Sequence, residues 1–174
     1  MSKVVFKLED DISTDVIYPG RFMATVLPTE TPQFAFADYT EFNSKLKNKE
    51  IPPGSVLIAG NNFGCGSSRE QATSTLKGHE LTVVAKSFAR IFLQNSINLG
   101  LKTVICPGIE GEVGDEIEVT HDKVINKTSG KSSDIIPFLL RYLMRKTSSS
   151  LWSLTEILLR SKMMLFILSS IILK

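Results

Sequence analysis

The segment with the clearest chemical potential is 61–72, with the sequence NNFGCGSSREQA. Its glycines allow the backbone to approach a ligand closely. A helix predicted to begin there would expose free N–H groups and the positive end of its dipole, and the forked guanidinium of Arg69 can bind a carboxylate through two hydrogen bonds. The residues alone therefore predict a carboxylate or phosphate site, with the hydroxyls of Ser67 and Ser68 close to the bound group.

The same segment also has a purely structural interpretation. Glycine-rich turns between a strand and a helix often serve only packing, and serine is a common residue at the start of a helix, where its hydroxyl caps a free N–H. The motif by itself leaves both interpretations open.

The elements that would position this segment alternate between strand and helix. Apolar runs at 55–60, 81–85 and 103–106 predict buried strands, and helical periodicity at 69–77 and 89–99 predicts helices that end at Gly78 and Gly100. This alternation predicts an α/β fold with parallel strands and crossover helices. The other expected elements are a strand at 4–8, a short β-prone run at 16–18, a mobile loop at 21–32, a helix within 34–46 and a hairpin at 117–120 and 123–125.

Composition narrows the class of protein. The chain has 174 residues, a formal net charge of +2, 43% hydrophobic and 22% charged residues, which is typical of a soluble globular protein and predicts no nucleic-acid partner. Its two cysteines and two histidines do not have the number or spacing of a metal site made by this chain alone. The N-terminus is too short and polar for a signal peptide, so we expect a cytoplasmic protein with reduced thiols and no membrane association.

Three blocks of sequence together resemble a known family. They are 61–72, 10–21 (DDISTDVIYPGR) and 86–92 (KSFARIF), the last followed by Asn95 and Asn98. In this order and spacing they resemble the swivelling domain of the aconitase superfamily, which includes aconitase, homoaconitase and isopropylmalate dehydratase. The resemblance covers roughly residues 3–127. It implies a three-layer β/β/α swivelling domain, as in the aconitase C-terminal domain, which we place at 1–134.

The resemblance implies roles for the residues of the central block. Ser67 matches the catalytic base, which removes a proton from the carbon next to a carboxylate. A serine hydroxyl needs a positive environment for this, and a helix N-terminus beside Arg69 would supply it. Ser68 matches a position that hydrogen-bonds the substrate, and Arg69 matches an arginine that binds a substrate carboxylate. Asn62 and Gly66 are the further candidates for substrate contact, with shaping of the loop as the alternative for Asn62.

Other residues receive supporting or structural expectations. Asp15, with Thr14 beside it, matches a family acid that faces the catalytic region of a partner subunit, and capping of a local turn is the equally weighted alternative. We expect Asp10 and Asp11 to be solvated turn residues. The remaining expectations are a packed, non-ligating thiol at Cys65, a structural or interface role for Arg90, and surface positions for His79 and His121.

The implied reaction removes water from a 2-hydroxy acid and adds it back at the neighbouring carbon. It needs an iron that acts as a Lewis acid, and the cysteines that hold the 4Fe-4S cluster are not in this chain. In split members of the family a large subunit carries them. The resemblance therefore implies the small subunit of a two-subunit hydro-lyase, which binds no cofactor itself and is active only with its iron–sulfur partner.

Substrate choice in split members is set by the loop after the Pro-Gly turn, here Arg21, Phe22, Met23, Ala24 and Thr25. Members that act on an extra carboxylate place an arginine where this chain has Ala24, although Arg21 is close enough in sequence to compensate. The apolar pair Phe22 and Met23, together with the missing arginine, therefore favours isopropylmalate, the substrate of this reaction in leucine biosynthesis. The alternatives are the homoaconitase small subunit of lysine biosynthesis and a non-catalytic module that only binds carboxylates.

The C-terminal tail, 135–174, departs from the family, whose small subunits end in a compact Gly-Gly-Leu-type segment. Serines at 148–150 suggest a linker, and the uncharged stretch 163–173 is shorter than the roughly 18 residues that suggest a membrane span. Three interpretations remain open: a surface-lying or partner-binding helix, a segment packed on the domain, and a stretch translated out of its usual register.

Overall fold

The alternation of strands and helices folds into a mixed α/β arrangement in the computed structural model, which describes residues 2–137. The compact unit extends over Met1–Ile136. Predictions for the tail from residue 138 onward lie outside the described residues, and the expected domain boundary at 134 stays a prediction. No helix within residues 2–137 is long and apolar enough to cross a membrane.

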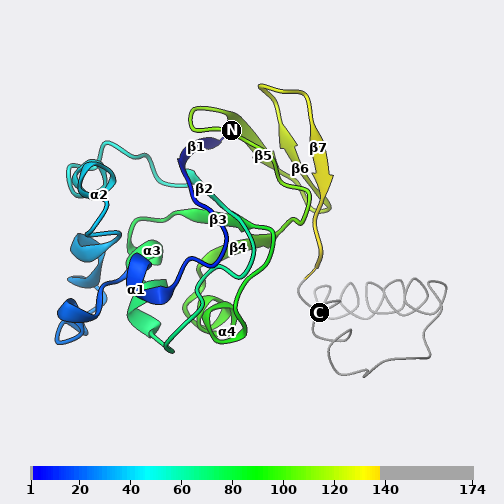
Figure 1. Cartoon of the computed structure of the whole chain (residues 1–174). Helices are drawn as coiled ribbons and strands as arrows, with labels where there is room; N and C mark the ends of the chain where they lie inside the picture. The colour runs from blue at the N-terminus through cyan, green and yellow to red at the C-terminus, as the bar shows by residue number, and fades with distance from the viewer. Residues whose placement is uncertain (1, 138–174) are drawn as a thin grey trace, which may run out of the picture. The chain divides into compact units, whose positions relative to one another are not determined.

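Four parallel strands form one side of the sheet (Figure 1): β1 (Ser2–Lys7), β2 (Val56–Ala59), β3 (Thr82–Ala85) and β4 (Lys102–Ile105). Helix α3 (Glu70–Gly78) connects β2 to β3, and α4 (Arg90–Leu99) connects β3 to β4. Every residue of β2 and β3 is buried, because both faces of these strands are covered. The predicted parallel strands and crossover helices are thus confirmed.

Three antiparallel strands continue the sheet beyond β1: β5 (Glu116–Val119), β6 (Lys123–Asn126) and β7 (Ser132–Asp134). The β5–β6 hairpin was predicted. Strand β7 was not, because its sequence Ser-Ser-Asp has low strand propensity and its position depends on pairing with β6. The full strand order is β4-β3-β2-β1-β5-β6-β7.

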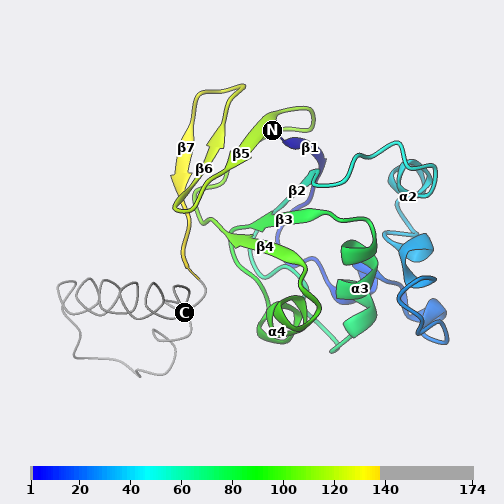
Figure 2. The same cartoon turned by 180° about the vertical axis from the view of Figure 1, so that it is seen from behind.

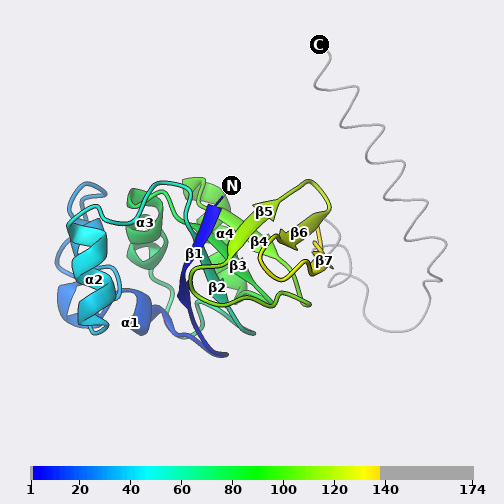
Figure 3. The same ribbon diagram turned by 90° about the horizontal axis from the view of Figure 1, so that it is seen from above.

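Two apolar clusters on opposite faces of the parallel strands divide the fold into three layers. Leu57 and Val83 point into the cluster that includes Leu76 of α3 and Phe92 of α4. The alternate strand residues, such as Ile58 and Val84, pack with Ile117 and Val124 of the hairpin. Figure 2 shows α3 and α4 on one side of β3 and β4, and Figure 3 shows β5–β7 on the side of β1 away from α2. This is the expected α/β three-layer arrangement.

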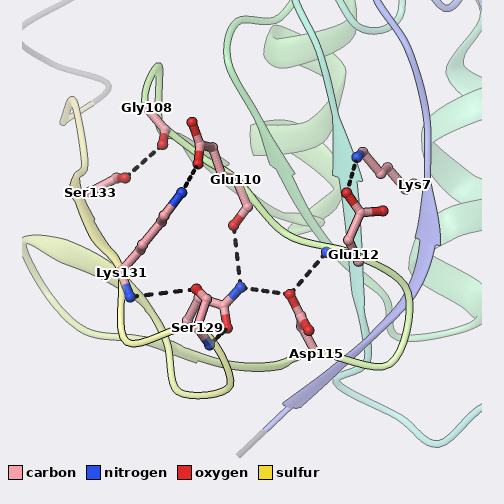
Figure 4. Close-up of polar contacts among 9 residues, drawn as sticks. Lys7, Gly108, Glu110, Glu112, Asp115, Ser129, Lys131 and Ser133 are labelled. Atoms are coloured by element: carbon pink, nitrogen blue, oxygen red, sulfur yellow. Dashed lines mark hydrogen bonds and ion pairs between the residues drawn. The ribbon is translucent and has the colours of Figure 1, made fainter.

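Polar contacts attach the hairpin layer to the segment that precedes it (Figure 4). Lys131 pairs with Glu110 at 2.6 Å, and the Ser133 hydroxyl donates to the carbonyl of Gly108 at 2.6 Å. The buried Asn126 amide donates to Asp115 at 2.7 Å, while its own oxygen accepts from two backbone N–H groups of the following turn. The contacts to Gly108, Glu110 and Asp115 join residues 11 to 25 positions apart, so they were not predictable from local pattern.

One N-terminal prediction is wrong, and a second is confirmed only in part. Residues expected as a β-prone run instead form the short helix α1 (Thr14–Ile17), because Ser13 caps it by accepting from the N–H of Val16 at 3.3 Å. The helix expected within 34–46 is shorter, α2 (Thr40–Lys47), since Phe36 has a positive φ of 50°, which a right-handed helix does not allow.

The segment expected as a loop at 21–32 is not irregular throughout. It begins with a 3₁₀ turn, η1 (Gly20–Phe22), and runs into a second, η2 (Thr31–Phe34). Three contacts attach η2 to α3 and its C-cap: the Thr31 hydroxyl lies 3.0 Å from that of Ser74, Thr75 donates to the carbonyl of Thr31 at 2.8 Å, and His79 Nε2 lies 2.8 Å from the carbonyl of Pro32. Hydrogen bonds to α3 therefore order this end of the loop.

His79 is half-buried in this contact, which corrects the expected surface position. Its burial should also make the stability of the fold depend on pH. Burial lowers the pKa of His79 below its ordinary value of about 6.5. The unfolded chain then binds a proton as pH falls through that value, before the folded protein does, so we expect the free energy of unfolding to decrease from pH 7 toward pH 5. Chemical denaturation of His79→Gln should show a smaller decrease.

The exposed His121 supplies the matched control for this prediction. The pH profile of His121→Gln is measured beside that of His79→Gln, so that the loss of the half-buried imidazole is compared with the loss of an exposed one. An unchanged profile in His79→Gln would contradict the assignment of this pH dependence to His79.

Thr73 gives a stability prediction. Its side chain is fully buried on α3, and its hydroxyl has no hydrogen-bond partner among residues 2–137. Thr73→Val keeps the shape and removes the unsatisfied group, so it should raise the free energy of unfolding by about 1 kcal/mol. The equally buried Thr75 donates to Thr31, and Thr75→Val should therefore destabilise the fold. Both variants are measured by chemical denaturation. Changes of the same sign in their free energies of unfolding would contradict this account.

Candidate functional site

The three sequence blocks meet at the carboxyl ends of β1, β2 and β3, where open α/β sheets bind their ligands. Beyond these strands the chain continues in parallel: Ser13 forms an isolated bridge with Cys65, and Phe63 forms one with Phe88. Each block therefore follows the end of its own strand, and the central block lies between the other two.

Backbone hydrogen bonds fix this arrangement. The N–H of Gly64 donates to the carbonyl of Ile12 at 2.8 Å, and the N–H of Thr14 donates to that of Cys65 at 2.8 Å. On the other side, the N–H of Ala89 donates to the carbonyl of Phe63 at 2.9 Å. The loop that carries the two serines is thus held along both edges by main-chain contacts.

A cleft of about 500 Å³ opens between this loop and the start of α4. Thr14, Gly64 and residues 66–69 line one wall, and residues 89–92 with Gln94 line the other. Among residues 2–137, two arginines and no aspartate or glutamate line this cleft, so its charge favours an anion.

Ser67 and Ser68 lie in the cleft with exposed side chains. Neither caps α3, which corrects the structural interpretation: the N-cap of α3 is Arg69, without a side-chain capping bond. The carbonyl of Ser67 accepts from the buried Thr14 hydroxyl at 2.8 Å, which holds the backbone of the loop. Among residues 2–137 neither serine hydroxyl has an intramolecular partner, so both are available to a ligand.

The Arg69 side chain is only 14% exposed and its guanidinium is fixed at one nitrogen. Nη1 pairs with the carboxylate of Asp15 and also donates to the carbonyl of Tyr18 at 3.2 Å. Within the described part of the chain, Nη2 and Nε have no partner. A Cβ on Gly20 would come 3.3 Å from Asp15 Oδ1 and 3.4 Å from Arg69 Nη2, so Gly20 lies directly beside this ion pair. Asp15 thus contacts Arg69 from the first turn of α1, whose N-cap is Ser13.

Asn62 is placed differently from the substrate-contact prediction. Its side chain donates to Asp11 Oδ1 at 2.8 Å, its N–H donates to the Ser87 hydroxyl at 2.8 Å, and it does not line the cleft. Asn61 bonds Asp10 in the same way, and its backbone N–H lowers the pKa of that carboxyl. Asp10 and Asp11 are exposed, as expected, but both shape the loop. Gly66 does line the cleft, with a φ of 85°.

The expected specificity loop, 21–25, is not part of the cleft lining. Arg21 pairs with Asp38 at 2.5 Å and lies over the ring of Phe22, which stacks on Phe34 with the centroids 4.2 Å apart. The buried Tyr18 hydroxyl lies 3.0 Å from the carbonyl of Phe22 and 3.2 Å from that of Thr25. The guanidinium of Arg21 is paired with Asp38, so the structure does not support the idea that Arg21 replaces a missing cation near Ala24.

Neither cysteine lies in a metal-binding group. Cys65 is half-buried and donates to the carbonyl of Asp11 at 3.2 Å, and Cys106 is buried, which raises the pKa of its thiol. Among residues 2–137 no three or more His, Cys, Asp and Glu side chains come together in a group able to hold a metal ion. The side chains present in this part of the chain do not fit an iron–sulfur cluster.

The second wall of the cleft was not predicted from the sequence. Arg90, Ile91 and Gln94 line it, although Arg90 was expected to be structural or at an interface. The available signal was position: Arg90 and Ile91 belong to the third block and Gln94 follows it, and that block comes directly after a parallel strand.

Comparison with known proteins gives a consistent result. The model of the aconitase C-terminal domain matches residues 10–107. The chain is 42% identical to the 3-isopropylmalate dehydratase small subunit 1 of Archaeoglobus fulgidus, over 76% of this chain and 82% of that protein. It is 41% identical to the isopropylmalate/citramalate isomerase small subunit of Methanocaldococcus jannaschii, over 73% and 76%.

A solved structure agrees with these relatives. The crystal structure of 3-isopropylmalate dehydratase (LeuD) from Methanocaldococcus jannaschii matches with a TM-score of 0.69 at 33% identity, over 93% of this chain and 95% of that one. The relatives named here carry the isopropylmalate name, and none is a homoaconitase. The three blocks, the layered fold and these matches together show that the chain belongs to the aconitase C-terminal domain family, with the small subunits of 3-isopropylmalate dehydratase.

Proposed function

We propose that the chain is the small subunit of a two-subunit hydro-lyase that isomerises 3-isopropylmalate by loss and re-addition of water. The observation that carries this proposal is the cleft without acidic side chains, in which two unpaired serine hydroxyls lie next to Arg69. The names of the relatives supply the substrate class, and the geometry supplies the parts that such a substrate needs.

Ser67 is the proposed base. It would take the proton from the carbon next to a substrate carboxylate, and its alkoxide would be stabilised by the neighbouring Arg69 and by the start of α3. The exposed position of Ser67 and its lack of an intramolecular partner among residues 2–137 support this role. Ser68 would donate a hydrogen bond to the same substrate.

Arg69 is the proposed carboxylate clamp. Asp15 and the Tyr18 carbonyl hold Nη1, so the fork is oriented before the substrate arrives. Nη2 and Nε would then bind the carboxylate through two hydrogen bonds. In this proposal Asp15 acts through Arg69 as a positioning residue, and its contact with a partner subunit stays a prediction.

A separate large subunit completes the proposal. Because the described residues do not fit a cluster, the 4Fe-4S cluster would reside in that partner. The relatives are named as small subunits, which supports a large-subunit partner. This chain would contribute the base and the clamp from one side of a shared site.

The test is anaerobic co-purification with the large subunit of the same organism, followed by assays of 3-isopropylmalate, citramalate and homocitrate-type substrates. We expect a complex that turns over isopropylmalate, while each subunit alone is inactive. Citramalate is included because one relative is named for both substrates. Turnover of the homocitrate type alone would move the chain to the homoaconitase reaction. Carboxylate binding without turnover in an assembled complex would identify a binding module instead.

A further inference from the structure

The second arginine of the cleft has no role in the proposal above. Arg90 is the first residue of α4 and lines the wall opposite the serines. It is exposed, and within residues 2–137 no carboxylate lies within ion-pair distance of it. Arg69 differs, because Asp15 already neutralises part of its charge. Arg90 thus lines the cleft as a cation that has no acidic partner among residues 2–137.

The position of Arg90 is fixed by the site itself. The N–H of Ala89, its chain neighbour, donates to the carbonyl of Phe63, and Gly64 lies directly against the ring of Phe92. The first turn of α4 is therefore held against the serine loop. Within residues 2–137 no acidic side chain lines the cleft or pairs with Arg90, so this cation is available to a ligand.

We propose that Arg90 binds the second carboxylate of a dicarboxylate substrate whose first carboxylate is held by Arg69. This inference rests on the proposed function and deepens it. A 2-hydroxy dicarboxylate carries two anionic groups on adjacent carbons, and two arginines on facing walls match two anions. The charge on Arg90 would then select dicarboxylates over monocarboxylates of similar shape.

The test compares wild type with Arg90→Gln and Arg90→Lys. The full chain is titrated with 3-isopropylmalate and with isovalerate, a branched monocarboxylate, and backbone amide shifts of residues 64–69 are followed by NMR. We expect wild type to bind the dicarboxylate at least about tenfold more tightly, and Arg90→Gln to lose most of this preference. Arg90→Lys should recover part of it. Lys102→Gln, an exposed charge change at the start of β4, should match wild type.

The same variants are then measured in the complex with the large subunit. Arg90→Gln should raise KM for isopropylmalate about tenfold or more without weakening association of the subunits. Unchanged dicarboxylate preference and unchanged KM would overturn the inference, and so would a loss confined to subunit association. An active complex indifferent to residue 90 would leave the proposed function standing. No binding and no turnover by wild type would overturn both.

Discussion

Ser67→Ala is expected to lower kcat of the reconstituted complex by about 10²- to 10⁴-fold, which is the usual contribution of a general base. The Ser67 hydroxyl makes no intramolecular hydrogen bond among residues 2–137, so its removal should not disturb the loop. The contact that holds this loop uses the carbonyl of Ser67 and the hydroxyl of Thr14, and alanine keeps it. KM should change little, because Arg69 remains in place.

The measurement is steady-state turnover together with the dissociation constant for the large subunit. Ser44→Ala, an exposed serine on α2, is the matched control and should keep wild-type activity. Activity of Ser67→Ala within a few fold of wild type would exclude Ser67 as the base. A parallel loss of subunit association would assign it a structural role.

Gly64→Ala is expected to lower the free energy of unfolding more than Gly66→Ala or Thr75→Val. An added Cβ would lie 2.2 Å from Cγ of the Phe92 ring, at a φ of 79°. Phe92 is buried and stacks with Phe88, so the ring cannot move aside without opening the core. Steric overpacking of this kind costs about 1–3 kcal/mol in addition to the backbone strain.

Gly66→Ala separates the effect of the clash with Phe92 from the effect of the positive φ. Gly66 has a similar φ of 85°, but its Cβ would meet nothing closer than 3.7 Å. Gly66→Ala should therefore pay only the backbone strain of about 1–2 kcal/mol. Chemical denaturation of both variants gives the difference directly. Equal destabilisation would mean that the backbone conformation, and not the ring, sets the requirement for glycine at 64.

The sequence predicted those parts of the fold that local pattern specifies. The apolar runs that became β2 and β3 are continuous because both of their faces are buried, and such runs are visible without any alignment. Strand β7 and the positive φ of Phe36 were missed, because each depends on contacts or conformations that no local pattern encodes. The cap at Ser13 was available in the sequence, but the β-branched residues after it favoured a strand.

The site was predicted in part for the same reason. The adjacency of Ser67, Ser68 and Arg69 is local, and all three line the cleft. The Arg69–Asp15 pair joins residues 54 positions apart, and a single sequence does not reveal such a pairing. Asn62 looked equally suited to a ligand, but its amide is taken by Asp11. Which polar group faces the ligand and which faces the loop is decided by tertiary contacts.

The two hydrogen bonds of the Tyr18 hydroxyl determine which substitutions the turn at 22–25 can tolerate. This hydroxyl lies within hydrogen-bond distance of the carbonyls of Phe22 and Thr25, and every amino acid supplies a carbonyl. The exposed side chain of Ala24 therefore does not determine the shape of this turn, whereas the half-buried Met23 packs against the core. Substitutions at position 24 should therefore cost little folding stability, because the main-chain carbonyls that Tyr18 contacts are kept, whereas position 23 is constrained by its contact with the core.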